Sequence, residues 1–179
     1  MEARRNVEIK AFVPDPPALH AAVQALTKRN QPDLELEQSD VFYSGTREGS
    51  LLKLRNENGA AGGSLIGYRR PHKTGPKLSK FHKVDVPDWK ALHATLRIGL
   101  GRSLVVTKQR RVWIHEQTRI HLDRVTDLGD FVELEVMLRP GQSVADGQSI
   151  ADVLMDQLGI DKEHLCDRAY KEMLEERNQ

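Results

Sequence analysis

The chain has 179 residues, of which 39% are hydrophobic and 30% charged, so it can bury a core and is too apolar for wholesale disorder. Its 27 basic side chains nearly balance its 26 acidic ones, and a net charge of +1 gives no general attraction to nucleic acid or to acidic membranes. A single cysteine excludes an internal disulfide and a Cys-based metal cluster, and no apolar run approaches membrane-spanning length.

The N-terminal half is predicted to hold one helix and several short strands. Prolines beginning at Pro14 end a first strand over Arg5–Val13, and Asp15 can cap a helix with Pro16 in its first turn. Four more strands are predicted, over Ser39–Ser44, Ser50–Glu57, Ser64–Arg70 and Ser79–Val86. The pair Asn58-Gly59 indicates a tight turn between two of them.

The C-terminal half is predicted to add three strands and three helices. Asp88 can cap a helix that ends near Gly99. Three longer strands follow, over Ser103–His115, Thr118–Thr126 and Phe131–Arg139. Two helices close the chain, roughly Ser149–Leu158 and Lys162–Glu176. Because most strand connections are short, we expect a largely antiparallel sheet in a single domain, 1–179.

Charged and apolar side chains alternate along several of these strands. On the first strand, Glu8 and Lys10 share one face and Val7, Ile9 and Ala11 the other. An antiparallel sheet usually turns its polar face to water, which is the ordinary interpretation of any one such strand. Two features favour an inward polar face here: it is poor in Ser, Thr and Gln, and four amphipathic helices need an apolar surface to cover. The residues concerned are Glu8, Lys10, Lys53, Arg55, Arg69, Lys108, Arg110, Asp123, Glu133 and Glu135.

A ligand is needed if these charges line an interior. A closed barrel of eight strands has room for one small ligand, but burying so many charges without a partner is prohibitive. A polyphosphate with divalent metal ions meets the need, because Arg and Lys pair with phosphate oxygens while carboxylates hold Mg²⁺ or Mn²⁺. Of the seven histidines, only His121 is predicted to face this interior, and a lone histidine is rarely a ligand.

The same segments resemble the CYTH, or triphosphate tunnel metalloenzyme, superfamily. Glu8-Ile9-Lys10 resembles the end of the Glu-x-Glu-x-Lys signature, with Asn6 in place of its first Glu. Further similar segments follow in the family's order: Lys53-Leu54-Arg55, Tyr68-Arg69-Arg70-Pro71, Lys108–Trp113, His121-Leu122-Asp123, Leu128–Glu135 and Ala169–Leu174. Their order and joint presence carry the resemblance, which covers essentially the whole chain and is greatest to the class IV adenylyl cyclase branch.

The resemblance implies both a fold and a set of roles. The fold would be α+β, an eight-stranded antiparallel β tunnel with about four helices packed on its outside. Glu8, Glu133 and Glu135 would hold Mg or Mn, and Asp123 would join them or orient them. The phosphate-binding lining would be Lys10, Lys53, Arg55, Arg69, Lys108 and Arg110, with Lys10, Lys108 and Arg110 as the catalytic candidates. Asn6 brings no charge, so the number of metals depends on whether the later glutamates compensate.

Three functions remain open from the sequence. In an adenylyl cyclase, the ribose 3′-hydroxyl of ATP would attack the α-phosphorus and pyrophosphate would leave. In a triphosphatase, water would attack inorganic triphosphate, thiamine triphosphate or a nucleotide within the same lining. Asn6 motivates the third, a non-catalytic anion-binding protein. We expect a cytoplasmic protein, because the N-terminus lacks a signal-peptide core, with no nucleic-acid or membrane partner and a possible homodimer.

Overall fold

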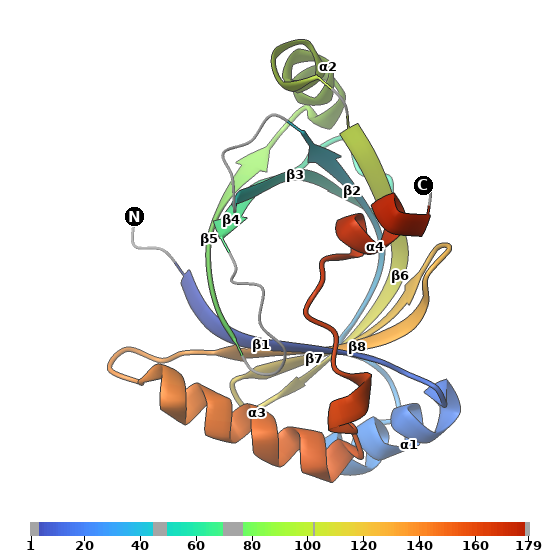
Figure 1. Cartoon of the computed structure of the whole chain (residues 1–179), viewed down its shortest axis with the longest axis vertical. Coiled ribbons are helices and arrows are strands. Elements are labelled where there is room, and N and C mark those ends of the chain that lie inside the picture. The colour runs from blue at the N-terminus through green and yellow to red at the C-terminus, as the bar shows by residue number, and fades with distance from the viewer. Residues whose placement is uncertain (1–3, 45–49, 70–76, 102, 178–179) are drawn as a thin grey trace.

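An antiparallel barrel forms the body of the molecule. The computed structural model describes residues 4–44, 50–69, 77–101 and 103–177. Within these residues, eight strands close into one barrel in the spatial order β1-β5-β4-β3-β2-β6-β7-β8 (Figure 1). The strands are β1 (Arg4–Phe12), β2 (Leu34–Tyr43), β3 (Ser50–Glu57), β4 (Gly63–Arg69), β5 (Lys77–Val86), β6 (Ser103–His115), β7 (Thr118–Val125) and β8 (Gly129–Met137). Because β1 pairs with both β5 and β8, the ring is closed, and the predicted eight-stranded antiparallel barrel is confirmed.

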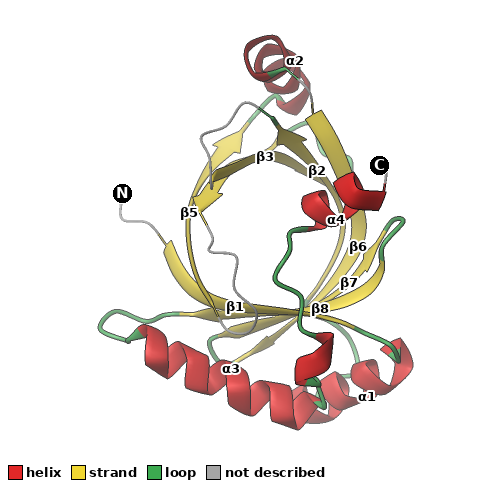
Figure 2. Cartoon of the chain, viewed as in Figure 1, coloured by secondary structure: helices red, strands yellow, loops and turns green. Residues whose placement is uncertain are grey.

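Three helices pack on the outer face of the barrel. Figure 2 shows α1 (Pro16–Thr27) and α3 (Val144–Leu158) on one side of it and α2 (Trp89–Leu100) on the opposite side. The outward side chains of β1, including Val7 and Ile9, share one buried core with α1 and α3. A second core under α2 contains Val41 of β2 and Leu54 of β3. The apolar faces of the strands therefore point out to the helices, and the charged faces are left to line the interior.

Side-chain caps define where the outer helices begin. Asp15 accepts a hydrogen bond from the backbone N–H of Ala18, and Asp88 does the same at the start of α2, as the sequence predicts. Helix α3 begins at Val144, five residues before the predicted start. Its first turn is fixed by a capping box in which Ser143 and Asp146 each accept from the other's backbone N–H.

The end of the chain forms a short helix inside one mouth of the barrel. The single helix predicted over Lys162–Glu176 is instead a 3₁₀ turn (Lys162–His164), an extended link and α4 (Tyr170–Arg177). The link is extended because Leu165 bridges to Ala11 and the Cys166 N–H donates to the Lys10 carbonyl. Helix α4 then packs through Tyr170 and Leu174 on four apolar side chains of this mouth, Phe42, Val106, Val125 and Phe131. Among the described residues, none of the helices is long and apolar enough to cross a membrane.

Candidate functional site

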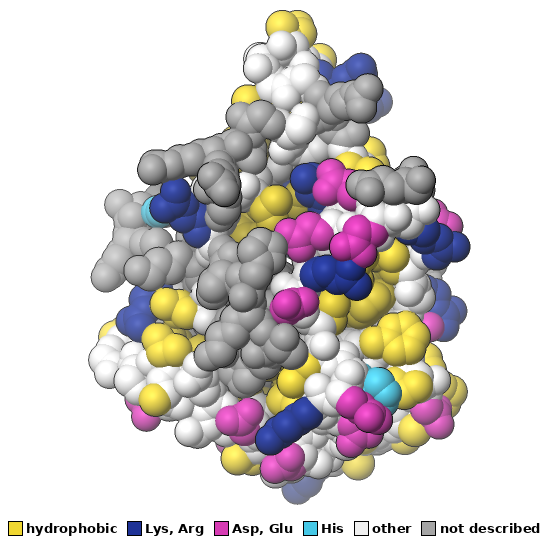
Figure 3. All heavy atoms as spheres, viewed as in Figure 1, with side chains coloured by type: hydrophobic (Ala, Val, Ile, Leu, Met, Phe, Trp, Pro, Cys, Tyr) yellow, Lys and Arg dark blue, Asp and Glu magenta, His cyan; other side chains and the backbone are white. Residues whose placement is uncertain are grey.

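A cavity of about 520 Å³ runs inside the barrel, a size typical of small-molecule sites. Strands from all round the barrel contribute to its walls, and Ala169 and Tyr170 contribute from the C-terminal segment. Eight of the predicted site residues line it: Glu8, Lys10, Lys53, Arg55, Lys108, Arg110, Glu133 and Glu135. Figure 3, drawn from the α4 side, shows acidic and basic side chains next to one another on the surface around this mouth. Acidic and basic side chains are therefore mixed on this surface, and they separate into two walls only inside the cavity.

One wall of the cavity is a cluster of cations around a single buried carboxylate. Arg55 binds both oxygens of Asp40 at 2.6 and 2.7 Å, and the Lys53 ammonium lies 2.9 Å from one of them. Lys108 is 3.9 Å from the same carboxylate, which is only 2% exposed. Burial would raise the pKa of Asp40, but the charges of Lys53, Arg55 and Lys108 outweigh it and hold that pKa well below its usual range.

The same cluster has more positive than negative charge. Burial, together with the neighbouring Arg55, lowers the pKa of Lys53 to about 7, even though Asp40 attracts its proton. Burial and the nearby Arg110 also lower the pKa of Lys108. Asp40 is shared among three cations, of which Lys108 also lies 3.7 Å from Asp123, so this wall favours the arrival of an anion.

A second buried network is centred on Arg110. Its guanidinium binds both oxygens of Asp123 at 2.6 and 2.5 Å and donates to Glu133 at 2.6 Å. The hydroxyl of Tyr170 donates to Asp123 at 3.0 Å, and the Lys108 ammonium lies 3.7 Å from it. Both oxygens of Asp123 are therefore engaged by protein groups. Of the two roles expected for Asp123, this arrangement matches orienting the site rather than holding a metal.

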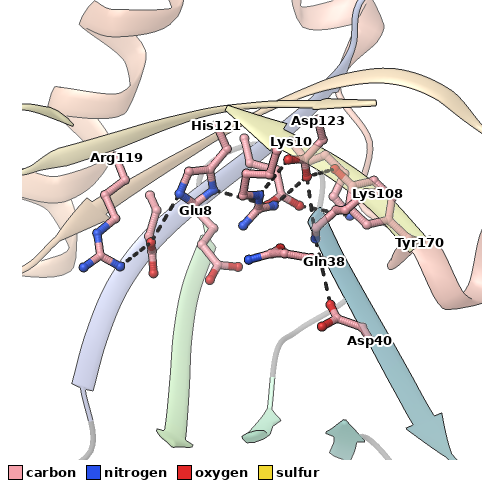
Figure 4. Close-up of polar contacts among 12 residues, drawn as sticks. Glu8, Lys10, Gln38, Asp40, Lys108, Arg119, His121, Asp123 and Tyr170 are labelled. Atoms are coloured by element: carbon pink, nitrogen blue, oxygen red, sulfur yellow. Dashed lines mark hydrogen bonds and ion pairs between the residues drawn. The ribbon is translucent and has the colours of Figure 1, made fainter. Parts of the chain in front are cut away.

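The opposite wall carries the three predicted glutamates. β1 and β8 place Glu8 directly opposite Glu135 and Lys10 directly opposite Glu133. The Asn6 amide nitrogen donates to Glu8 at 3.1 Å and to Glu135 at 2.7 Å, so it ties the two carboxylates together. Figure 4 shows Glu8, Lys10 and His121 side by side on this wall, with Asp40 across the cavity.

Two buried polar atoms on this wall lack hydrogen-bond partners among the described residues, Asn6 Oδ1 and His121 Nδ1. Since the carboxylates can only accept, they fix which end of the Asn6 amide faces them, and Oδ1 is left over. Burial and the charge of Arg110 lower the pKa of His121 and outweigh Glu133 and Glu135, which raise it, so the neutral ring is favoured. Carboxylates and an amide oxygen are the ligand types that Mg²⁺ and Mn²⁺ prefer, so the oxygen donors of this wall fit a divalent cation.

Lys10 links the acidic wall to the C-terminal segment. Its ammonium donates to the backbone carbonyl of Arg168 at 2.8 Å and lies 3.7 Å from Glu133. It also lies 4.0 Å from the centre of the Tyr170 ring, close enough for a cation–π contact. The C-terminal segment therefore helps to position a lysine of the β1 motif.

One predicted lining residue lies elsewhere. Arg69 is exposed and donates to the Ser50 hydroxyl at 3.1 Å, whereas Ile66 and Tyr68 line the cavity from β4. The prediction that Arg69 lines the tunnel is wrong because alternation along β4 groups it with Leu65, which packs in the core under α2. The prediction that His121 faces the interior is confirmed.

Several polar lining residues were missed in the sequence. They are Gln38, Asp40, Glu57, Lys83, Arg119 and Tyr170. Gln38 and Asp40 gave no clear signal, because Ser39 lies between them and Phe42 shares their face, so the segment lacks the clean alternation of β1. Tyr170 gave no signal either, since its position depends on the docking of α4.

Comparisons with known proteins agree with this geometry. A sequence model of the CYTH domain family matches residues 4–170. An Aeromonas hydrophila protein named adenylate cyclase CyaB is 26% identical over 185 residues, covering 98% of this chain and 91% of that protein. The solved structure of PH1012 from Pyrococcus horikoshii OT3 superposes with a TM-score of 0.82 at 19% identity, covering 93% of this chain and 98% of that one. HpAC1 from Hippeastrum, described as having a dominant triphosphatase activity, gives a TM-score of 0.58 at 15% identity, covering 97% and 95% of the two chains. At these identities, the solved structures show the fold alone.

Proposed function

This chain belongs to the CYTH domain family, and on that premise we propose that it is a metal-dependent adenylyl cyclase that converts ATP to cyclic AMP and pyrophosphate. The observation that carries the proposal is the meeting of two kinds of wall in one cavity. Cations from β3 and β6 face three glutamates from β1 and β8, and Lys10 of β1 lies beside Glu133. The similarity to a protein named adenylate cyclase supports the choice of reaction.

The cationic wall would bind the triphosphate. Arg55 presents a planar guanidinium already held in place by Asp40, so little side-chain freedom is lost when a phosphate oxygen arrives. Lys53 and Lys108 flank it and share the same carboxylate. A triphosphate would supply the negative charge that this cluster lacks.

The acidic wall would hold the metal. Glu8, Glu133 and Glu135 are the carboxylate ligands we propose, with Asn6 Oδ1 as a neutral oxygen ligand in place of the family's first glutamate. A bound Mg²⁺ or Mn²⁺ would supply Lewis-acid stabilisation of the phosphate oxygens. Asn6 also keeps two of the carboxylates together through its amide nitrogen.

Three cations, Lys10, Lys108 and Arg110, are the proposed catalytic groups. Burial would lower the pKa of Arg110, but Asp123 and Glu133 outweigh it and raise that pKa well above its usual range, so the charge is permanent. A fixed cation of this kind stabilises the negative charge that develops on a departing pyrophosphate. The apolar contacts of α4 close one mouth, which limits the entry of water that would compete with the ribose hydroxyl.

Phosphorus NMR of the products tests the proposal. The protein would be incubated with ATP and, separately, with inorganic triphosphate, each with Mg²⁺ or Mn²⁺. Cyclic AMP with pyrophosphate is the expected result. Orthophosphate from either substrate would replace the cyclase by the triphosphatase alternative. Metal-dependent binding without turnover would favour the non-catalytic anion-binding alternative, and an Asn6→Glu variant that gains turnover would strengthen it.

A further inference from the structure

The inward face of β2 changes character along its length. Leu34 and Leu36 are apolar, Gln38 carries an amide, and Asp40 anchors the cation cluster, and all four line the cavity. The acidic and cationic walls account for Asp40 but not for the other three. The chemistry of those three side chains differs from what a phosphate chain requires, so they suit another part of a ligand.

Gln38 holds an unsatisfied hydrogen-bond acceptor in the cavity wall. The side chain is 4% exposed, and its nitrogen donates to the Glu57 carboxylate at 2.7 Å. Because a carboxylate only accepts, this bond fixes the orientation of the amide. Its oxygen, Oε1, is buried and has no hydrogen-bond partner among the described residues. In Figure 4, the Gln38 side chain lies between Glu8 on one side and Asp40 and Lys108 on the other.

The missing partner must be a donor. An ionised phosphate offers only acceptor oxygens, so the triphosphate itself cannot satisfy Gln38 Oε1. A hydroxyl or amino group can. Because burying an unpaired acceptor costs stability, a site that keeps one is suited to a ligand that supplies the donor.

Beyond Gln38, the inward faces of β2 and β6 become apolar and reach solvent, with Arg119 of β7 paired beside Ile114. Leu34 pairs with Val112 of β6 in the sheet, and Ile114 lies further along the inward face of β6. Leu34 is 51% exposed and Ile114 45% exposed, although both face the cavity. The opposite mouth, by contrast, is filled by α4, and its Phe131 is 4% exposed. We name Leu34, Leu36, Val112 and Ile114 the apolar rim.

We propose that Gln38 and the apolar rim form a subsite for the non-phosphate part of an organic triphosphate, in which an apolar ring packs on the rim and an attached donor group binds Gln38 Oε1. A nucleoside has this chemistry, with donors on both the ribose and the base. The inference rests on the proposed function and names its substrate class: an organic triphosphate rather than inorganic triphosphate. Asp40, two residues further along the same face, begins the phosphate-binding wall.

Calorimetric titration in EDTA, where metal-dependent turnover is suppressed, tests this subsite. Four probes would be compared: ATP, 2′,3′-dideoxy-ATP, ITP and inorganic triphosphate. Gln38→Met keeps the length of the side chain and removes the amide. We expect it to weaken ATP binding about tenfold and to leave inorganic triphosphate unchanged. The wild-type protein should bind ATP more tightly than at least one of dideoxy-ATP and ITP, and the analogue that binds more weakly identifies the donor as ribose hydroxyl or base amine.

Ile114→Ser is a second variant that does not depend on the buried amide, because the side chain is half exposed. It should weaken ATP binding without affecting inorganic triphosphate, whereas Ile98→Ser, at an 89% exposed position on α2, should affect neither. Equal losses for ATP and inorganic triphosphate in Gln38→Met and Ile114→Ser would overturn the inference. So would a wild-type protein that binds all three nucleotides alike and no better than inorganic triphosphate. Failure of both ATP and inorganic triphosphate to bind the wild type, in EDTA and with Mg²⁺ alike, would overturn the proposed function itself, and the inference with it.

Discussion

Neutralising Asp40 should destabilise the free protein and make it more dependent on an anion. Asp40→Asn keeps the shape of the side chain but leaves Lys53, Arg55 and Lys108 without their shared counter-charge. The substitution disrupts a bidentate pair at 2.6 and 2.7 Å and a 2.9 Å ammonium hydrogen bond, at a site that is 2% exposed. Breaking a buried ion pair from one side costs about 3–5 kcal/mol, and the openness of the cavity to solvent places our expectation near the lower end, at about 3 kcal/mol.

Urea unfolding in EDTA, with and without inorganic triphosphate, measures both effects. The variant should lose about 3 kcal/mol of unfolding free energy without ligand and regain part of it when triphosphate replaces the missing charge. The matched control is Asp130→Asn, which breaks an exposed pair with Arg124 and should cost less than about 1 kcal/mol. A loss for Asp40→Asn no greater than that of the control, or no added stabilisation by triphosphate, would refute the reasoning.

Three further predictions concern other parts of the site. A bound phosphate should raise the pKa of Lys53 from about 7, so triphosphate binding above pH 7 must take up a proton. The affinity for triphosphate should therefore fall by up to about tenfold per pH unit above pH 7. Calorimetric titrations at several pH values should show this fall in the wild type and not in Lys53→Arg. Asn6→Glu adds a third carboxylate beside Glu8 and Glu135, so the melting temperature of the variant in EDTA should be lower than that of the wild type. Adding Mn²⁺ should raise the melting temperature of the variant more than that of the wild type, and equal increases would contradict the proposed metal wall. Tyr170→Phe removes one hydrogen bond to a buried carboxylate and should lower the unfolding free energy by about 1–2 kcal/mol in denaturant titrations, and an unchanged value would mean that the hydroxyl does not anchor α4.

The strands were largely predictable because each carries its own periodicity. Ser50–Glu57 and Ser103–His115 match β3 and β6 residue for residue. The last helix was not predictable in this way. Its helical periodicity is overridden at Leu165 and Cys166 by pairing with β1, a tertiary contact that local sequence does not encode. This contact is what brings Tyr170 into the cavity.

The site was predictable where a motif or a charged face repeated, and less so elsewhere. The charges of β1, β3, β6 and β8 were expected to meet, and they do. Alternation correctly paired Gly67 with Arg69 on one face of β4, but it does not say which face is inside, and Arg69 lies on the outer one. Asp40 and Gln38 belong to no motif, and their importance follows from partners that only the closed barrel brings together.

The central claim is that the inward cations of the barrel bind a triphosphate, and one titration tests it most directly. Inorganic triphosphate would be titrated calorimetrically into the wild type, Arg55→Met and Arg124→Met. Losing a buried charge contact costs about 2–5 kcal/mol, so Arg55→Met should weaken binding at least about thirtyfold while the exposed control Arg124→Met binds like the wild type. Equal affinity for all three proteins would contradict the account, because the triphosphate would then bind outside the barrel.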